Sequence, residues 1–260
     1  MSIRVLFMGR KAVAAACLEL LHTSPSFSVV GVLCDSHLAV SPTRDMANKL
    51  RIPLLNHKDV DSMIDSAQLQ FDLGLSVLYW RKIKGSLLKY PRLGIINFHP
   101  APLPDLKGYG GYNIAILERR DHYGVTAHYV DAEIDTGAII KVTDFAIDKD
   151  VETAKTLEAK SMESIDLLFR EVIDSVVESP TNLLDTTVNS GGRYTTRKDI
   201  EEMKQILPSE DVDTKIRAFW FPPYHGAKIQ VEGKWYTLVN DEILLSLADP
   251  ASSSLHTPGV

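Results

Sequence analysis

The first half of the chain alternates short apolar runs with amphipathic segments, and this alternation limits the possible folds more than any other feature. Apolar runs of strand length lie at residues 3–8, 27–34, 71–79 and 94–98. Amphipathic stretches separate them, one beginning at Ser41-Pro42, which offers an N-cap and a proline at the first helical position. Strands alternating with helices predict parallel βαβ units with right-handed crossovers and helices on both sheet faces. We therefore expect an α/β domain built on a mostly parallel sheet.

The second half predicts two more strands, a long helix and a smaller C-terminal unit. Ser, Thr, Asn, Asp and Gly crowd residues 179–193, which predicts a connector. Glu232-Gly233 joins two alternating runs and predicts a β-hairpin. The other expected elements are strands at 125–130 and 139–147, a long helix at 152–178, and short helices near 199–206 and 212–220. We expect an N-terminal domain at 1–180, a C-terminal subdomain with the hairpin at 181–250, and a disordered tail at 251–260.

Composition excludes several function classes. The formal net charge of −6 and a pI near 5.8 disfavour non-specific binding to nucleic acid. Cys17 and Cys34 sit in apolar runs, which indicates core thiols and no redox or metal pair. No apolar run has transmembrane length, and no signal-peptide core follows Met1. We expect a soluble cytoplasmic protein that binds neither a membrane nor nucleic acid.

Polar side chains with catalytic potential follow the apolar run at 94–98. Asn97 and His99 are two residues apart, so both side chains point to the same side of an extended strand end. An amide donor can stabilise an oxyanion, which is worth about 100- to 1,000-fold in rate. A histidine can move protons near neutral pH, and a carboxylate such as Asp135 can orient it or stabilise its charged form. Taken singly, each residue is more often a packed, surface or turn residue.

These three functions suit acyl transfer to an amine without a metal. No cysteine and no G-x-S-x-G serine is placed as a nucleophile, so direct attack by the amine fits better than a covalent intermediate. Three prolines follow His99 within five residues and stiffen the exit loop. One of their peptide bonds is a candidate for the cis form.

The run NFHPAPLP, with the later VDAEIDTGAII, resembles the signature of the folate-dependent formyltransferases. That family includes methionyl-tRNA, glycinamide ribonucleotide and sugar-nucleotide enzymes. Its pattern of Asn-x-His, Leu-Pro and Asp-x-Gly matches Asn97, His99, Leu103-Pro104 and Asp135 with Gly137. The resemblance implies a Rossmann-like formyltransferase domain with N10-formyltetrahydrofolate as co-substrate and a catalytic triad of Asn97, His99 and Asp135. Ala101 stands where many relatives carry Ser, which removes a hydroxyl contact and leaves the triad intact.

The same resemblance implies where the folate binds. The pterin is expected beside the end of the third strand and beside the loop at 131–135, held mostly by backbone groups. The residues expected there are Ser76, Val77, Leu78, Tyr79, Asp131 and Ile134. An ordinary role in the strand core is equally open for Val77 and Leu78.

Three features bear on the acceptor. Arg10 and Lys11 open a predicted helix without a complete G-x-G-x-x-G pattern, and they can bind phosphate or remain a solvated surface pair. Tyr109, Gly110 and Gly111 form either a close approach to ligand or a simple turn. A late aromatic cluster can stack on a nucleobase, or pack in the core or a dimer interface; its members of interest are Trp220, Phe221 and Tyr224.

The segments PAPLPDLKGYGGYN, RYTTRKDIE and IRAFWFPPYHGAKI resemble the sugar-nucleotide branch of the family. This implies a nucleotide-linked acceptor such as dTDP-4-amino-4,6-dideoxyglucose, a role in O-antigen and lipopolysaccharide synthesis, and a homodimer formed through the C-terminal region. Four alternatives stay open: formylation of glycinamide ribonucleotide, formylation of methionyl-tRNA, hydrolysis of formyl-folate, and an inactive nucleotide-binding scaffold. The short, acidic chain disfavours the tRNA acceptor.

Overall fold

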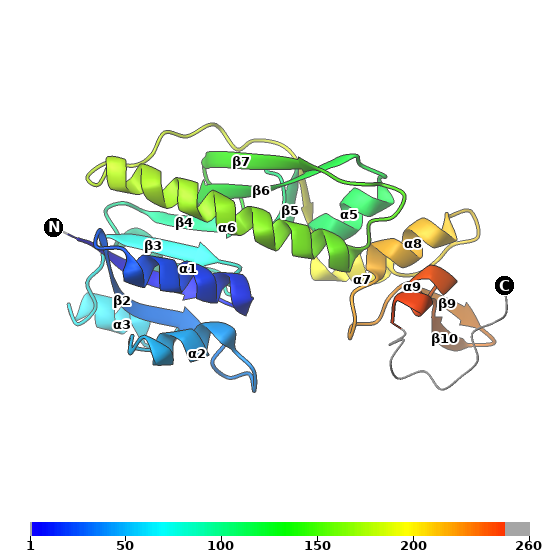
Figure 1. Ribbon diagram of the computed structural model, residues 1–260, viewed down its shortest axis with the longest axis horizontal. Helices are drawn as coiled ribbons and strands as arrows, with labels where there is room; N and C mark the ends of the chain where they lie inside the picture. The colour runs from blue at the N-terminus through cyan, green and yellow to red at the C-terminus, as the bar shows by residue number, and fades with distance from the viewer. Residues whose placement is uncertain (1, 248–260) are drawn as a thin grey trace.

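The computed structural model describes residues 2–247, and within that range six strands form the main sheet (Figure 1). Their order is β2-β1-β3-β4-β6-β7. The first four pair in parallel, whereas β6 and β7 run antiparallel to their neighbours. The elements of this half are β1 (Ile3–Gly9), α1 (Lys11–Thr23), β2 (Phe27–Cys34), α2 (Pro42–Lys49), α3 (Val60–Asp65), β3 (Leu73–Val77), α4 (Gly85–Lys89), β4 (Ile95–His99), β6 (His122–Tyr129), β7 (Ile139–Ala146) and α6 (Ala154–Glu178).

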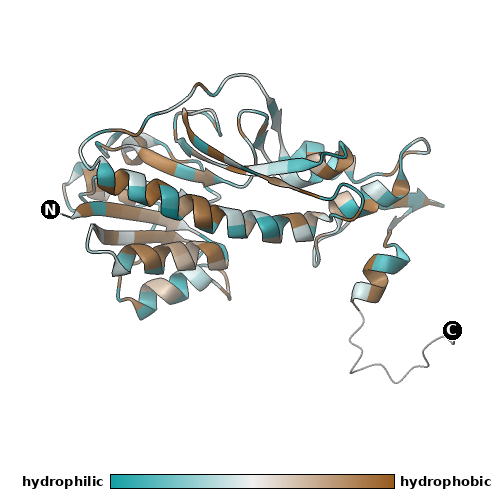
Figure 2. Cartoon of the chain, turned by 45° about the horizontal axis from the view of Figure 1, so that its top comes forward, coloured by the Kyte–Doolittle hydropathy of each residue, from teal (hydrophilic) through white to brown (hydrophobic). Residues whose placement is uncertain are grey.

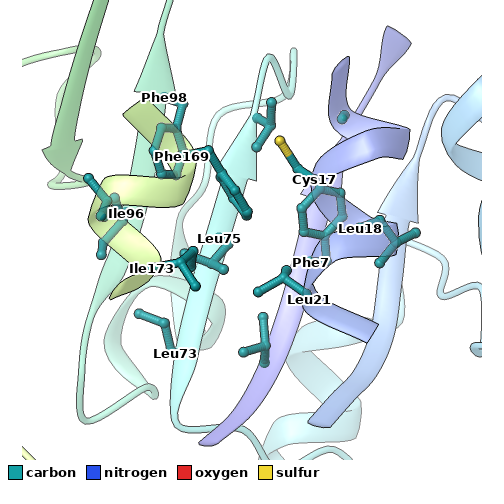
Figure 3. Packing of buried hydrophobic residues seen from close by; sticks show 14 of the residues in the cluster. Phe7, Cys17, Leu18, Leu21, Leu73, Leu75, Ile96, Phe98, Phe169 and Ile173 are labelled. Carbon is teal, nitrogen blue, oxygen red and sulfur yellow. The ribbon is translucent and has the colours of Figure 1, made fainter. Parts of the chain in front are cut away.

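Helices cover both faces of this sheet, because successive strand residues point to opposite sides. On one face, Phe7 packs with α1 and α6 (Figure 3). There the ring centroids of Phe98 and Phe169 lie 4.9 Å apart, which joins β4 to α6. On the other face, Leu6 and Met8 pack against α3 and α4. The hydropathy colouring shows the apolar strands between these layers (Figure 2).

A short parallel pair of strands lies beside the carboxyl end of β4. It consists of β5 (Leu106–Gly108) and β8 (Arg193–Thr195), which are remote in sequence. Between them in the chain, α5 (Gly111–Leu117) follows Gly110, which has φ +77°. The pairing therefore attaches the segment after residue 192 to the loop that follows β4.

The remaining elements lie at the end of the molecule opposite the N-terminus (Figure 1). They are α7 (Arg197–Met203), α8 (Val212–Phe219), β9 (Lys228–Val231), β10 (Lys234–Thr237) and α9 (Asp241–Ser246). A buried cluster that includes Ile216 and Phe219 of α8 packs them against α5 and the start of α6.

The α/β fold with a mostly parallel sheet is confirmed, and so are the sequence-based expectations for its larger elements. Ser41 caps α2 by accepting a hydrogen bond from the Arg44 N–H, with Pro42 following it. Glu232 and Gly233 form the two-residue turn between β9 and β10 with positive φ angles, as type I′ turns require. Cys17 is buried in the core and Cys34 is half-buried, and burial raises the pKa of both thiols.

The connector expected at 179–193 follows the sheet closely. Thr187 pairs with Ile139 at the start of β7, and the Leu184 N–H donates to the Tyr129 hydroxyl. The division of the chain near residue 180 stays a prediction, and the expected tail at 251–260 lies outside the described residues. Among residues 2–247, no helix is long and apolar enough to cross a membrane.

Candidate active site

The carboxyl end of β4 brings Asn97 and His99 to one edge of the sheet, on the same side of the strand. The register places Ser76 of β3, Asn97 of β4 and His128 of β6 side by side across three strands. These polar side chains meet at the place where parallel strands end, which is where α/β folds bind ligands.

The loop between β6 and β7 brings Asp135 to the same place. Asp135 has φ +57°, a left-handed conformation that is uncommon for a residue other than glycine. Gly137 follows at a crossing so close that a Cβ atom there would lie 1.9 Å from the Tyr129 carbonyl oxygen. The glycine of the Asp-x-Gly pattern is therefore required by backbone packing, and it lets the loop turn the carboxylate inward.

Asp135 contacts two histidines and one backbone donor. Its Oδ2 atom lies 3.5 Å from His99 Nδ1 and accepts a 2.9 Å hydrogen bond from the Gly108 N–H. Its Oδ1 atom lies 3.7 Å from His128 Nε2. The expected convergence of Asn97, His99 and Asp135 is thus present in the structure.

Hydrogen bonds set the orientation of Asn97. The Ser76 hydroxyl donates to its Oδ1 atom at 2.8 Å, and its Nδ2 atom donates to His128 Nε2 at 3.1 Å. His128 can accept there because its Nδ1–H donates to the Tyr129 carbonyl at 2.7 Å. One N–H of the Asn97 amide remains to meet a ligand.

His99 is held through its other ring nitrogen. The Leu106 carbonyl lies 3.0 Å from Nε2, so Nε2 carries the proton and Nδ1 presents a lone pair beside Asp135. Burial lowers the pKa of His99, although the carboxylate of Asp135 acts in the opposite direction. The neutral ring is therefore the resting form near pH 7, with an anion beside it to stabilise the protonated form.

Asp135 remains ionised beside these histidines. Burial alone would raise its pKa, but His99, His128 and the Gly108 N–H outweigh that effect and lower the pKa of Asp135 to about 2. The site accordingly combines a neutral imidazole, a fixed carboxylate and an oriented amide.

A cavity of about 340 Å³ opens in front of these residues. Ten of the residues expected at ligand sites line it: Arg10, Lys11, Ser76, Leu78, Tyr79, Tyr109, Gly110, Gly111, Asp131 and Ile134. Asn97, His99 and Asp135 line the same cavity.

Four expected ligand residues do not line this cavity. Val77 lies wholly within the core, because its side chain points into the sheet face under α1 and α6. Trp220 and Phe221 pack against the buried cluster of α5 and α8, and Tyr224 is 71% exposed. Phe221 lies near one lining residue, since its ring centroid is 5.8 Å from the Lys11 ammonium nitrogen.

Several lining residues escaped the sequence analysis. His128 was recognisable as a polar residue within an apolar run, but only the antiparallel register shows that it faces Asn97. Glu158 of α6 reaches the cavity and forms an ion pair with Lys11. Tyr112 and the segment 80–83 also line it. Within the described range, no cluster of three or more His, Cys, Asp or Glu side chains is arranged to bind a metal ion.

Comparison with known families identifies the class of this fold and site. A family model described as formyl transferase matches residues 1–173, which is more than half of the chain. The protein therefore belongs to the formyl transferase family.

Individual relatives differ in what they share with the chain. A methionyl-tRNA formyltransferase from Roseiflexus sp. is 29% identical over 164 residues, covering 59% of this chain and 50% of that protein. A second one, from Nitrosomonas eutropha, is 27% identical over 256 residues, covering 93% and 79%. The chain thus spans about half the length of the first of these relatives.

Solved structures show the fold over nearly the whole chain. A 4-N formyltransferase from Francisella tularensis matches with a TM-score of 0.75 at 20% identity, covering 92% of this chain and 97% of that one. An N-formyltransferase from Helicobacter canadensis, in complex with folinic acid and dTDP-3-aminofucose, matches with a TM-score of 0.71 at 22% identity, covering 89% and 85%.

Proposed function

We propose that the protein transfers a formyl group from N10-formyltetrahydrofolate to the amino group of a nucleotide-linked amino sugar. The observation that carries this proposal is the meeting of Asn97, His99 and Asp135 at one cavity that is lined on two sides. The Francisella and Helicobacter structures, whose names describe N-formyltransferases, support the sugar branch by sharing the fold along most of the chain.

The formyl donor binds on the side of the cavity formed by Leu78, Tyr79 and the loop after β6. Asp131 shapes this loop, because its Oδ1 atom accepts hydrogen bonds from the Glu133 N–H at 3.1 Å and the Thr136 hydroxyl at 2.6 Å. With that side chain so engaged, the loop offers backbone groups to the pterin. Folinic acid in the Helicobacter structure supports a reduced folate as the donor.

The reaction begins when the acceptor amine attacks the formyl carbon. A C–N bond forms and the carbonyl oxygen becomes an oxyanion, which the remaining N–H of Asn97 stabilises. Neutral His99 cannot share this task through Nε2, since that N–H donates to Leu106. Asn97 is therefore the oxyanion donor at the start of the reaction.

His99 then moves the proton. Its Nδ1 lone pair accepts a proton from the attacking amine, and the resulting imidazolium is stabilised by Asp135 at 3.5 Å and by the Leu106 carbonyl. The same proton passes to N10 of the folate as the bond from N10 to the formyl carbon breaks. The products are the formamide and tetrahydrofolate.

The acceptor binds beside the donor, with its phosphates near Arg10 and Lys11. Both cations line the cavity, and Arg10 lies at the start of α1 with its Nε–H donating to the Leu78 carbonyl at 2.8 Å. Tyr109, Gly110 and Gly111 contact the sugar. We place the base along Phe221, which borders Lys11, with Trp220 and Tyr224 in the same segment.

A mass-spectrometric assay tests this proposal. The protein is incubated with N10-formyltetrahydrofolate and separately with dTDP-, UDP- and GDP-linked amino sugars, glycinamide ribonucleotide, methionyl-tRNA, or buffer alone. A formyl mass gain on one nucleotide-sugar class supports the proposal, with dTDP expected, consistent with a role in O-antigen and lipopolysaccharide synthesis. A formyl mass gain on methionyl-tRNA alone, the acceptor of the named sequence relatives, would refute the proposed acceptor and leave the proposed formyl-transfer reaction in place. Loss of formyl to buffer alone would indicate a hydrolase.

We further propose that the protein forms a homodimer through its C-terminal part. Trp235 and Tyr236 of β10 are each about half exposed, and Leu244 and Leu245 of α9 are more exposed still. Large exposed apolar side chains favour burial against a partner. Sedimentation velocity over a range of protein concentrations tests this proposal; a species of one mass at all concentrations, equal to the monomer, would refute it.

A further inference from the structure

The connector between α6 and β8 lies beside the loop that carries Asp135. Thr187 and Ile139 exchange both backbone hydrogen bonds, at 3.0 and 2.8 Å, so the connector lies beside the start of β7. Farther along, the Lys107 ammonium group donates to the Gly191 carbonyl at 2.8 Å. The connector residues between Thr187 and Gly191 are therefore held next to the catalytic loop from both sides.

Asn189 lies in this stretch and bonds the loop directly. Its Nδ2 atom donates to the Asp135 carbonyl at 3.0 Å and to the Gly137 carbonyl at 2.8 Å. Both amide hydrogens are used, and together they span the turn at Thr136. The bonded carbonyl on one side belongs to the residue with φ +57°.

We propose that Asn189 is a positioning residue for catalysis, which keeps the Asp135 backbone in its left-handed conformation so that the carboxylate stays between His99 and His128. This proposal rests on the proposed formyl transfer. It assigns a role in the active site to a segment of the chain that the sequence predicts only as a connector.

The chemistry of the contact suits an amide. Two carbonyl oxygens converge on one position, and a neutral amide with two N–H donors satisfies both. The Oδ1 atom of Asn189 is buried and has no hydrogen-bond partner among the described residues. The stabilising contacts of this side chain are thus the two bonds at the loop, since its other end gains none.

Asp135 is consequently held at two points, its carboxylate and its backbone carbonyl, by residues in or next to the β5–β8 pair. Its carboxylate accepts from the Gly108 N–H at the end of β5, and its backbone carbonyl accepts from Asn189. Gly108 pairs with Thr195 of β8, which the chain enters shortly after Asn189. Loss of Asn189 leaves the first contact in place and releases the backbone, so the effect falls on the position of the carboxylate.

The test compares Asn189→Ala and Asn189→Leu with wild type. Alanine removes both donors, and leucine does so while keeping a similar volume. Asn182→Ala is the matched control, because Asn182 is an exposed residue of the same connector. We expect kcat of both Asn189 variants to fall about 10- to 100-fold with little change in KM for the folate, as small displacements of catalytic groups do. The control should match wild type.

A second measurement separates positioning from general stability and does not depend on any substrate. The His99 imidazole is titrated by NMR in the free protein, with its resonance assigned from His99→Asn. Asp135 and His128 are the titratable groups acting on His99, and Asp135 raises its pKa. A displaced carboxylate should therefore lower the His99 midpoint in both Asn189 variants, in the direction expected for Asp135→Asn.

The outcomes are distinguishable. A lower midpoint with reduced kcat supports the proposal. A wild-type midpoint in folded Asn189 variants overturns it, even when their melting temperatures are lower, because the residue then acts on stability alone. If wild type transfers no formyl group, the proposed function fails, while the titration still decides whether Asn189 positions Asp135.

Discussion

The two ends of the molecule use polar and apolar side chains in opposite ways. At the carboxyl end of β4, His99 and His128 are buried, and their ring nitrogens contact named partners. At the C-terminal end, Trp235 is 49% and Leu245 73% exposed, so large apolar side chains face solvent there. Buried polar side chains at one end therefore contrast with exposed apolar side chains at the other.

This contrast separates a site whose side chains are fixed by the fold from a surface that is open to a partner. Buried polar groups persist only when their hydrogen bonds are satisfied, so the arrangement at β4 is determined by the surrounding sheet. Exposed apolar groups on the hairpin make few contacts within the chain, so changes there should affect association more than folding. The predictions below test each side of this comparison.

The largest effect is expected at the buried end. Asp135→Asn removes the charge that stabilises protonated His99, and we expect kcat to fall about 100- to 10,000-fold, the range of general acid–base catalysis. Single-turnover formyl transfer to the acceptor found in the mass-spectrometric assay measures this fall in rate. Asp185→Asn, an exposed change in the connector, should retain wild-type turnover. Turnover within tenfold of wild type in Asp135→Asn would contradict the triad.

Substitutions in the hydrophobic core beneath this site should strongly lower the free energy of unfolding. Phe169→Ala removes a fully buried ring that packs on Phe98 below the catalytic strand. We expect the free energy of unfolding to fall by about 3–5 kcal/mol. Urea denaturation at fixed protein concentration measures it. Leu167→Ala, an exposed position of the same helix, should change it by only about 0.5 kcal/mol.

The pH dependence should report His99. Burial lowers the pKa of His99 below its usual 6.5, and the neutral ring is the base, so activity is lost on the acid side. We expect kcat/KM, which reports the groups of the free enzyme, to fall about tenfold per pH unit below a midpoint under 6.5. Asp135, with a pKa of about 2, stays ionised over this range. A midpoint above 6.5, or constant kcat/KM down to pH 4.5, would show that another group limits the reaction.

A smaller effect is expected where the acceptor phosphates bind. Lys11→Ala removes a cation that lines the cavity and contacts Glu158. We expect KM for the acceptor to rise about tenfold with little change in kcat, because phosphate binding is common to ground and transition states. Steady-state kinetics with varied acceptor measures this. Lys49→Ala, a remote exposed lysine paired with Glu19, is the control. An equal fall in kcat would place Lys11 in the chemical step instead.

The smallest effect on folding is expected at the exposed end. Trp235→Ala should change the free energy of unfolding by no more than about 0.5 kcal/mol under conditions that keep the chain monomeric. The same change should weaken self-association, which sedimentation velocity measures on wild type and variant in parallel. If the Trp235→Ala variant dimerises as wild type does, the interface does not include the hairpin. If its monomer is much less stable than wild type, the hairpin contributes to folding and the contrast between the two ends does not hold.

Much of the site followed from short-range rules, and the remainder depended on distant contacts. The same-side placement of Asn97 and His99 followed from strand periodicity. Asp135 was assigned by resemblance, and the 3.5 Å approach to His99 agrees with that assignment. His128 was missed because its importance arises from the antiparallel pairing of its own strand, β6, with β4. The proposed base-binding aromatics are absent from the cavity lining, since Trp220 and Phe221 pack against a buried cluster.

Local physics in the sequence determined the elements themselves. The alternation of apolar runs produced the parallel strands, Ser41 and Pro42 started α2, and Glu232-Gly233 turned the hairpin, because each depends only on neighbours along the chain. Tertiary structure alone decided the antiparallel register that sets His128 against Asn97, and the approach of Asn189 to the Asp135 loop. Those contacts join residues that are remote in sequence, so they depend on how the strands and the connector are arranged in space.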